Sequence, residues 1–211
     1  MGCGSPSLRK TERSMAPETT PVLPRHVVIL AYPGAHLLNI AGSAEVFAAA
    51  NRAVQERASD AAPGDDAPYR LTTVSRNGGG VVTAAGVEIA TQPLSDLPPV
   101  VDALIIPGGA GIRPVMADKA MTRWVAETAQ RSRRVIGLGG GAFILAGAGL
   151  LSGRRCVSHW RFEDDFEREH PAVHLVRDAL FVADGPFITA AGSSASLDVG
   201  LRLVEEDLGP L

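Results

Sequence analysis

The sequence predicts an α/β protein built on a doubly wound, mostly parallel sheet with helices on both faces. Short apolar runs rich in β-branched residues alternate along the chain with longer segments of helical spacing. Several of these runs end in turns that contain glycine or proline, which is typical of buried parallel strands followed by loops. Right-handed crossovers between parallel strands place the connecting helices on both faces. A ligand is therefore expected at the carboxyl ends of the strands.

The first half of the chain supplies three or four strands and one helix. Residues 26–31 are apolar and lead into Tyr32-Pro33-Gly34, which predicts an inner strand followed by a loop. A helix is expected over residues 43–55, and the alternation of residues 69–75 predicts a second strand. Residues 81–90 contain two short strand-like pieces joined at Ala85-Gly86, which predicts a sheet edge or a hairpin.

The second half repeats the alternation. Residues 103–106 form a buried strand that ends at Pro107-Gly108-Gly109, and residues 118–132 have helical spacing. The remaining expected elements are inner strands at 135–138 and 156–158, a charged helix ending near 170, strands at 180–182 and 187–189, and a last helix over 194–206. Asp184-Gly185 between the two late strands is a hairpin signal.

Composition indicates a single globular domain. The chain has 211 residues, of which 45% are hydrophobic and 20% charged. We expect a disordered leader over residues 1–24, a folded domain over 25–208 and a short tail over 209–211, because the leader lacks apolar periodicity.

Charge and cysteine content restrict the partners. The net charge of −3 and the dispersed arginines argue against direct binding of nucleic acid, and no apolar run is long enough to cross a membrane. Cys3 and Cys156 are the only cysteines, so no disulfide framework or metal-ligand spacing arises. We expect a cytoplasmic protein that has no metal and no cofactor.

The most informative motif surrounds Gly139. Leu138-Gly139-Gly140-Gly141-Ala142 joins a predicted strand to a predicted helix, and His159 follows Gly139 by twenty positions in Ser158-His159-Trp160. This pattern resembles the nucleophile elbow of the ThiJ/PfpI superfamily, most closely the amidotransferase-like domains of AraC-type regulators and the isonitrile hydratases. The resemblance extends through Tyr32-Pro33-Gly34 and residues 41–47, 105–110 and 191–207, so it covers nearly all of residues 25–208. It implies a flavodoxin-like, ThiJ/PfpI-type fold and a homodimer.

Two departures from that family pattern concern its chemistry. The family carries a catalytic cysteine where this chain has Gly139, and an aspartate or glutamate where it has Asn39. Glycine tolerates a positive φ, so the turn is expected to survive without its nucleophile. Thiol-dependent covalent chemistry of the usual family kind is therefore not expected.

The predicted site gathers the residues that remain. For ligand binding we expect backbone or side-chain groups of the following residues: Asn39, Gly108, Gly109, Gly139, Gly140 and His159. If the chain is an enzyme, His159 and Glu45 would carry protons while Asn39 orients the substrate.

Each of these residues also has a plainer interpretation. The glycine cluster can be a flexible or closely packed turn, and Gly137 to Ala142 also fits a dinucleotide-binding template, although the next predicted strand ends without a ribose-binding acid. Asn39 can be a turn residue, Glu45 a helix-packing or dimer residue, and His159 a buried hydrogen-bonded residue. Cys156 is expected to behave as a small hydrophobe.

Two functions follow from the motif. The first is a ligand sensor linked to transcriptional regulation, similar to the amidotransferase-like half of an AraC-type regulator, because the chain stops where such regulators continue toward a helix-turn-helix. The second is a cysteine-independent hydratase, lyase or cyclase that uses the same pocket. Either way, the expected ligand is a small molecule with a carbonyl, amide or anionic group.

Overall fold

A computed structural model of the protein describes residues 24–57 and 67–210. Its centre is a sheet of eight strands in the order β3-β4-β2-β1-β5-β6-β10-β9. The leader predicted over residues 1–24 lies outside the described residues, except for Pro24.

The strands that were expected from apolar runs form the middle of this sheet. Its inner strands are β1 (Arg25–Leu30), β2 (Tyr69–Ser75), β5 (Val101–Ile106), β6 (Ser132–Leu138) and β10 (Phe187–Ala190). Each pairs in parallel with its inner neighbours. The side chains of β1 from Val27 onward are completely buried, because helices cover both faces of the sheet.

Hairpins close both edges of the sheet. β3 (Asn77–Val82) and β4 (Glu88–Pro93) pair antiparallel at one edge, and β9 (Phe181–Asp184) pairs antiparallel with β10 at the other. Gly185 has φ +59° in the second turn, so the hairpin predicted from Asp184-Gly185 is confirmed. The hairpin predicted around Ala85-Gly86 is confirmed as well.

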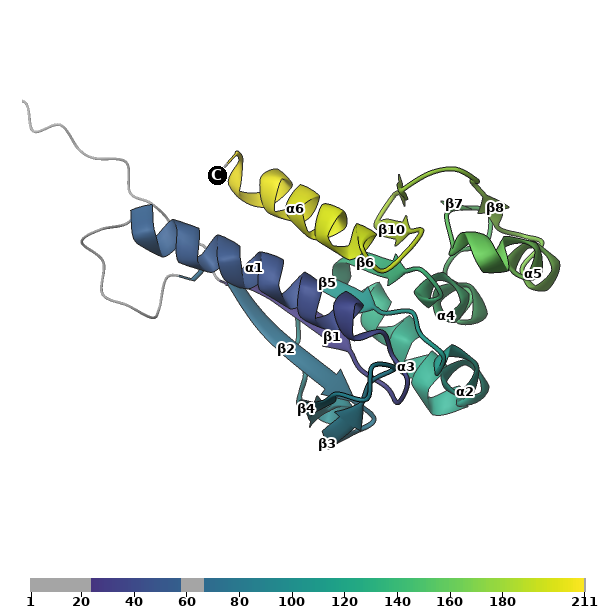
Figure 1. Ribbon diagram of the computed structural model, residues 1–211, viewed down its shortest axis with the longest axis horizontal. Helices are drawn as coiled ribbons and strands as arrows, with labels where there is room; N and C mark the ends of the chain where they lie inside the picture. The colour runs from purple at the N-terminus through teal and green to yellow at the C-terminus, as the bar shows by residue number, and fades with distance from the viewer. Residues whose placement is uncertain (1–23, 58–66, 211) are drawn as a thin grey trace, which may run out of the picture.

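Helices lie on both faces, as predicted. α1 (Leu37–Arg57) and α6 (Ala195–Leu208) run side by side on one face, and α3 (Lys119–Gln130) and α4 (Gly141–Gly147) pack against β5 and β6 (Figure 1). The remaining helices are short: α2 (Ile112–Ala117) and α5 (Glu163–Glu169), with 3-10 turns at Leu94–Asp96 and Trp160–Phe162. No helix in the described ranges has both the length and the apolar character that a membrane span requires.

Two predictions for individual elements were wrong, and one helix was not predicted. The strand expected at 156–158 does not belong to the main sheet, because β7 (Arg155–Cys156) pairs only with β8 (His174–Leu175) in a separate two-stranded sheet. Helix α1 begins at Leu37 and not near Ser43, so Asn39 lies within its first turn. The helix that was not predicted is α2, which is only six residues long and contains Pro114.

The connections place the loops of interest at one edge of the sheet. The chain leaves β1 toward β2 and then returns to β5 on the other side of β1, which makes a topological switch point. The loops after β1, β5, β6 and β10 all lie at the carboxyl ends of these parallel strands. Of the predicted site residues, Gly108 and Gly109 follow β5, Gly139 and Gly140 follow β6, Asn39 and Glu45 lie on α1, and His159 follows β7.

Candidate functional site

Gly139 forms the sharp turn between β6 and α4. Its φ is +55°, and its amide donates to the carbonyl of Ala190 at the end of β10 over 2.7 Å. A Cβ atom added at Gly139 would have no neighbour closer than the carbonyl oxygen of Ala191, at 3.8 Å. The turn therefore has the backbone of an elbow together with open space where a side chain would stand.

Gly141, two residues later, is a glycine for a different reason. A Cβ there would lie 2.2 Å from the carbonyl oxygen of Ile106, so the elbow and the end of β5 approach too closely for a side chain. The interpretation of the glycines as a closely packed turn thus holds for Gly141, whereas Gly139 has room for a side chain. The dinucleotide template finds no further support, since β10, the next strand in the main sheet, continues into Ala191-Gly192-Ser193 without an acid.

Asn39 connects two of the loops. Its side-chain oxygen accepts a hydrogen bond from the amide of Gly108 at 3.0 Å, and its side-chain nitrogen donates to the carbonyl of Ser193 at 3.3 Å. Asn39 is only 1% exposed, and both ends of its amide group are used by the backbone. The structure thus gives this residue a role in positioning the loops after β5 and β10, and its amide does not line the cavity.

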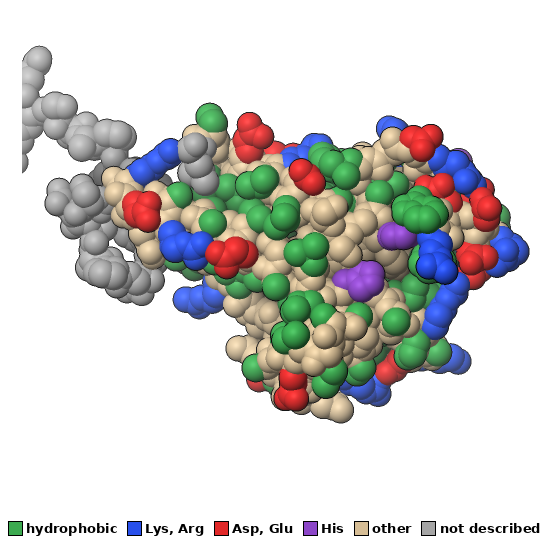
Figure 2. Space-filling model, viewed as in Figure 1, with side chains coloured by type: hydrophobic (Ala, Val, Ile, Leu, Met, Phe, Trp, Pro, Cys, Tyr) green, Lys and Arg blue, Asp and Glu red, His purple; other side chains and the backbone are tan. Residues whose placement is uncertain are grey.

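A cavity of about 460 Å³ lies over the elbow. It is lined by two histidines, two arginines, one carboxylate and apolar side chains, together with glycine backbone: His36, Gly109, Ala110, Ile112, Arg113, Gly139, Gly140, Phe143, His159, Arg161, Phe162, Asp165 and Ser193. Figure 2 shows histidine side chains reaching the surface beside apolar and basic groups on the face that carries α1 and α6. Four predicted site residues, namely Gly109, Gly139, Gly140 and His159, therefore share one cavity.

Gly108 and Glu45 lie elsewhere. Gly108 is buried behind the cavity, where its amide is held by Asn39. The side chain of Glu45 is 69% exposed on α1 and pairs with Arg52 at 2.6 Å. The structure does not bring Glu45 to the cavity, so its expected share in proton transfer has no geometric support.

His159 enters the cavity from the segment between β7 and α5. It precedes the 3-10 turn Trp160–Phe162, and its Nδ1 accepts from the amide of Arg161 at 3.3 Å. Its ring stacks on Trp160 with a centroid separation of 5.6 Å and lies 5.7 Å from the ring of Phe162. His159 is half-buried rather than enclosed, and the hydrogen bond found for its ring within the described residues uses Nδ1 and not Nε2.

His36 and Ser193 are cavity residues that the sequence analysis missed. The Oγ atom of Ser193 lies 3.0 Å from Nδ1 of His36, which joins the loop after β10 to the loop after β1. Burial lowers the pKa of His36 from its ordinary value, and the positive charge of a protonated His159 lowers it further. The signal that could have found both residues is their position, since each lies in a loop at the carboxyl end of an inner strand.

The arginines of the cavity have different environments. Arg113 on α2 forms a two-pronged ion pair with Glu169 at 2.5 and 2.7 Å, and its guanidinium lies 5.1 Å over the ring of Phe143. Arg161 forms no ion pair within the described residues and lies 6.0 Å from the ring of Phe162. The mouth therefore offers one arginine whose charge is not neutralised by a neighbouring carboxylate, which favours an anionic or carbonyl group.

Cys156 carries the only thiol among the described residues. This thiol is completely buried in β7, and burial raises its pKa to about 12. It does not line the cavity, so it behaves as the small hydrophobe that the sequence predicted. Among the described residues, no group of three His, Cys, Asp or Glu side chains could hold a metal ion.

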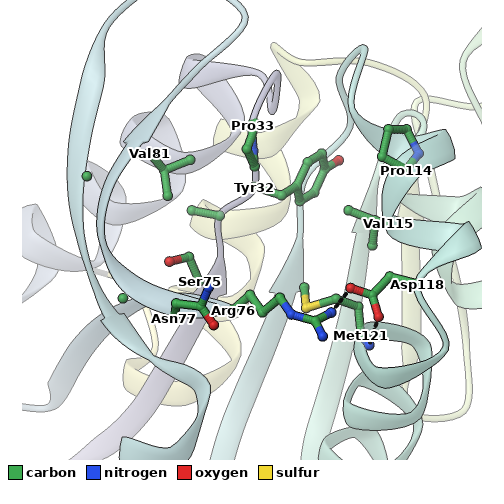
Figure 3. Close-up of a pocket in the computed structure, with 13 residues that line it drawn as sticks. Tyr32, Pro33, Ser75, Arg76, Asn77, Val81, Pro114, Val115, Asp118 and Met121 are labelled. Atoms are coloured by element: carbon green, nitrogen blue, oxygen red, sulfur yellow. Dashed lines mark hydrogen bonds and ion pairs between the residues drawn. The ribbon is translucent and has the colours of Figure 1, made fainter.

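A second cavity, of about 340 Å³, lies across α2 from the first. Tyr32 forms one wall, and an ion pair between Arg76 and Asp118 crosses its floor (Figure 3). Asp118 also accepts from the amide of Ala120 as the N-cap of α3, so both charges are already compensated. This cavity contains none of the predicted site residues.

Comparison with known proteins identifies the fold and its family. The model of the DJ-1/PfpI family matches residues 25–206. The chain belongs to the DJ-1/PfpI family. Among solved structures, it resembles a ThiJ/PfpI family protein from Pseudomonas syringae at a TM-score of 0.73 and 25% identity, over 93% of this chain and 76% of the other. An AraC family transcriptional regulator from Pseudomonas putida matches in fold, at a TM-score of 0.71 and 21% identity, over 88% of this chain and 94% of the other.

Curated relatives of this DJ-1/PfpI domain include regulators and an enzyme. It is 34% identical over 147 residues to the HTH-type transcriptional regulator CdhR of Pseudomonas aeruginosa, which covers 67% of this chain and 42% of the regulator. It is 31% identical over 131 residues to the isonitrile hydratase of Pseudomonas putida, covering 61% of this chain and 55% of that enzyme. The chain thus spans about half or less of the length of these two relatives.

Proposed function

We propose that this DJ-1/PfpI domain binds a small molecule without a cysteine nucleophile and serves as a ligand sensor linked to transcriptional regulation. One observation carries the proposal. The cavity over the elbow is fully formed, with a volume of about 460 Å³, and none of the residues that line it is a cysteine. The glycine at the elbow leaves space where the family nucleophile is expected, and the cavity remains suited to binding.

The lining residues indicate the class of ligand. Arg161 and His159 lie at the mouth, while Ile112, Phe143 and Phe162 supply apolar surface. A small molecule with an apolar body and one carbonyl, amide or anionic group would satisfy both parts. The regulatory link is supported by the relatives, since CdhR and two further types of regulator, GbdR and GlxA, are all HTH-type transcriptional regulators. A homodimeric, cytoplasmic protein is part of the same proposal.

A thermal-shift screen against a metabolite library tests this function, with mass spectrometry to follow each compound. We expect at least one compound with a carbonyl or anionic group to raise the melting temperature and to be recovered unchanged. His159→Ala should weaken that shift, whereas His174→Ala should not, because His174 is an exposed histidine on β8 that does not line the cavity. A stabilising compound whose effect is the same in both variants would contradict the assignment of this cavity.

One observation favours a second candidate, a cysteine-independent enzyme such as a hydratase, lyase or cyclase. His36 and His159 share the cavity, and the lowered pKa of His36 leaves it neutral near pH 7, where it can accept a proton. In the same screen, consumption of a compound by the wild type but not by His159→Ala would favour this enzyme over a sensor.

A further inference from the structure

The contact between Ser193 and His36 has the form of a nucleophile beside its base. We propose that Ser193 Oγ is an acyl-accepting nucleophile activated by His36 Nδ1, so that this cavity transfers acyl groups from small esters through serine. The inference rests on the proposed function in one respect, namely that this cavity is where the ligand binds.

The geometry of the two side chains supports this role. Ser193 Oγ and His36 Nδ1 are 3.0 Å apart, within the range expected of a serine and its general base, and both residues line the cavity. Ser193 lies in the loop that borders the open position at Gly139, where an added Cβ would be 3.9 Å from the Cα of Gly192. An acyl group on Ser193 would therefore lie close to the space left at the elbow.

The backbone of Ser193 is held in place by its neighbours. Its carbonyl accepts hydrogen bonds from the side chain of Asn39 at 3.3 Å and from the hydroxyl of Ser196 at 2.7 Å. The only hydrogen bond of the Ser193 hydroxyl within the described residues goes to His36. Because the backbone of Ser193 is fixed and its hydroxyl is hydrogen-bonded to a histidine, the side chain is already oriented as a nucleophile requires.

The reaction proceeds in two steps, acylation of Ser193 and hydrolysis of the acyl-serine. The Ser193 O–H bond breaks, its proton passes to His36 Nδ1, and Oγ bonds to the ester carbonyl carbon, whose π electrons move to oxygen. The tetrahedral adduct then expels the alcohol, which takes the proton from His36. Water hydrolyses the acyl-serine by the same path and restores both residues.

Other groups in the cavity suit this reaction. Gly109 and Gly140 line the cavity, and neither of their amides donates to another backbone oxygen in the described part of the chain, so both can serve a developing oxyanion. His36 must be unprotonated at the start, and the lowering of its pKa by burial agrees with that requirement. Phe143 and Ile112 provide apolar surface for a short acyl chain.

The test uses the whole chain with a fluorophosphonate probe and p-nitrophenyl butyrate. We expect one phosphonate adduct, located at Ser193. We also expect hydrolysis of the ester, and the same substitutions should reduce both the labelling and the hydrolysis. Ser193→Ala should abolish both, and His36→Gln should slow both by about 100-fold or more. Ser194→Ala is the matched control, because this neighbouring serine is exposed and its hydroxyl does not cap α6.

The outcomes separate this inference from the proposed function. A wild type that is not labelled, an adduct on another residue, or equal labelling of His36→Gln would overturn the role of Ser193. Melting curves of the two variants, with and without the stabilising compound from the metabolite screen, report whether the cavity is intact. If that compound still stabilises the wild type and Ser193→Ala while no acylation occurs, binding stands and the Ser193 nucleophile does not.

Discussion

Asn39 shows how a polar side chain beside the cavity can act through the backbone. It accepts from Gly108 and donates to Ser193, and its side chain is shielded from solvent. We predict that Asn39→Ala lowers the free energy of unfolding by about 1–3 kcal/mol, because the buried amide of Gly108 loses its acceptor. Urea denaturation measures this difference.

Asn39→Asp provides the comparison. A carboxylate keeps an acceptor for Gly108 but has no proton to donate to the Ser193 carbonyl. At low pH, where the acid is protonated, the stability of Asn39→Asp should therefore lie between that of the wild type and that of Asn39→Ala. It should decrease as the pH rises and the carboxyl ionises. Unchanged stability of Asn39→Ala together with lost ligand binding would instead make Asn39 a ligand group.

The open space at Gly139 predicts that a thiol can be introduced there. In a Cys3→Ser background, Gly139→Cys should react with iodoacetamide in the folded protein at pH 7, since the new side chain would have no neighbour within 3.8 Å of its Cβ. Cys156 should stay unmodified, because its thiol is buried and its pKa is about 12. Peptide mass spectrometry locates the adduct.

Gly139→Ala separates backbone strain from reactivity. At φ +55° any side chain costs about 1–2 kcal/mol, so both variants should melt below the wild type by similar amounts. Labelling at Cys156 and not at position 139 would show that the elbow does not face the cavity.

The sequence was sufficient to predict the cavity residues that belong to a local pattern. Gly139, Gly140 and His159 follow from the elbow motif and its spacing, and they do share a cavity. His36 and Ser193 could not be paired in this way, because they are 157 positions apart and meet only through the strand order β1-β5-β6-β10. Glu45 was misplaced because its nearness to the motif in the sequence does not show which side of α1 it occupies, and its side chain lies on the exposed side.

At the scale of secondary structure, the end of α6 is fixed by a buried ionic cluster. Asp207 accepts from Arg133, Arg134 and Tyr69 at 2.5, 2.6 and 3.0 Å, and its side chain is 1% exposed. Burial disfavours its charged form, but the hydrogen bonds from Arg134 and Arg133 outweigh that effect and lower the pKa of Asp207. The cluster thereby ties the last turn of α6 to β2 and β6.

We predict that Asp207→Asn destabilises the protein by about 3 kcal/mol, because Arg134 stays buried with one fewer carboxylate. Glu45→Gln is the control: its ion pair with Arg52 is exposed, so the change should cost less than about 0.5 kcal/mol. Urea denaturation of the two variants gives the comparison. Equal losses would mean that the cluster contributes no more than a surface ion pair.

Element prediction succeeded wherever the hydrophobic pattern was long. The five inner strands and helices α1, α3 and α6 were all anticipated, apart from their ends. The pattern could not show that the two-residue strand β7 pairs with β8, because an apolar run such as Cys156-Val157 is buried equally well outside the main sheet. The order of helices and strands along the chain is enough to indicate this fold. A strand of two residues, however, is too short for its hydrophobic pattern to show which strand it pairs with.

For the whole molecule, partly buried histidines set the response to acid. Burial lowers the pKa values of His26, His36 and His170 below the usual 6.5. The unfolded chain therefore binds more protons than the folded chain as pH falls through 6.5, so stability is fully present above that pH and is lost below it. Asp207 and Glu169, whose pKa values are lowered from 3.8 and 4.5, add a separate loss at more acidic pH.

We therefore predict that the melting temperature falls between pH 7.5 and 5.5, well before the carboxylates titrate. Each kcal/mol lost in this window should lower it by about 2–4 °C for a domain of this size. Differential scanning calorimetry at pH 7.5, 6.5 and 5.5 measures the fall, and His170→Gln should reduce it because the ring of His170 is enclosed by Phe143 and Phe166. His174→Gln, at an exposed position, should leave the fall unchanged. A melting temperature that stays constant down to pH 5 would mean that His26, His36 and His170 are protonated equally in the folded and unfolded chains.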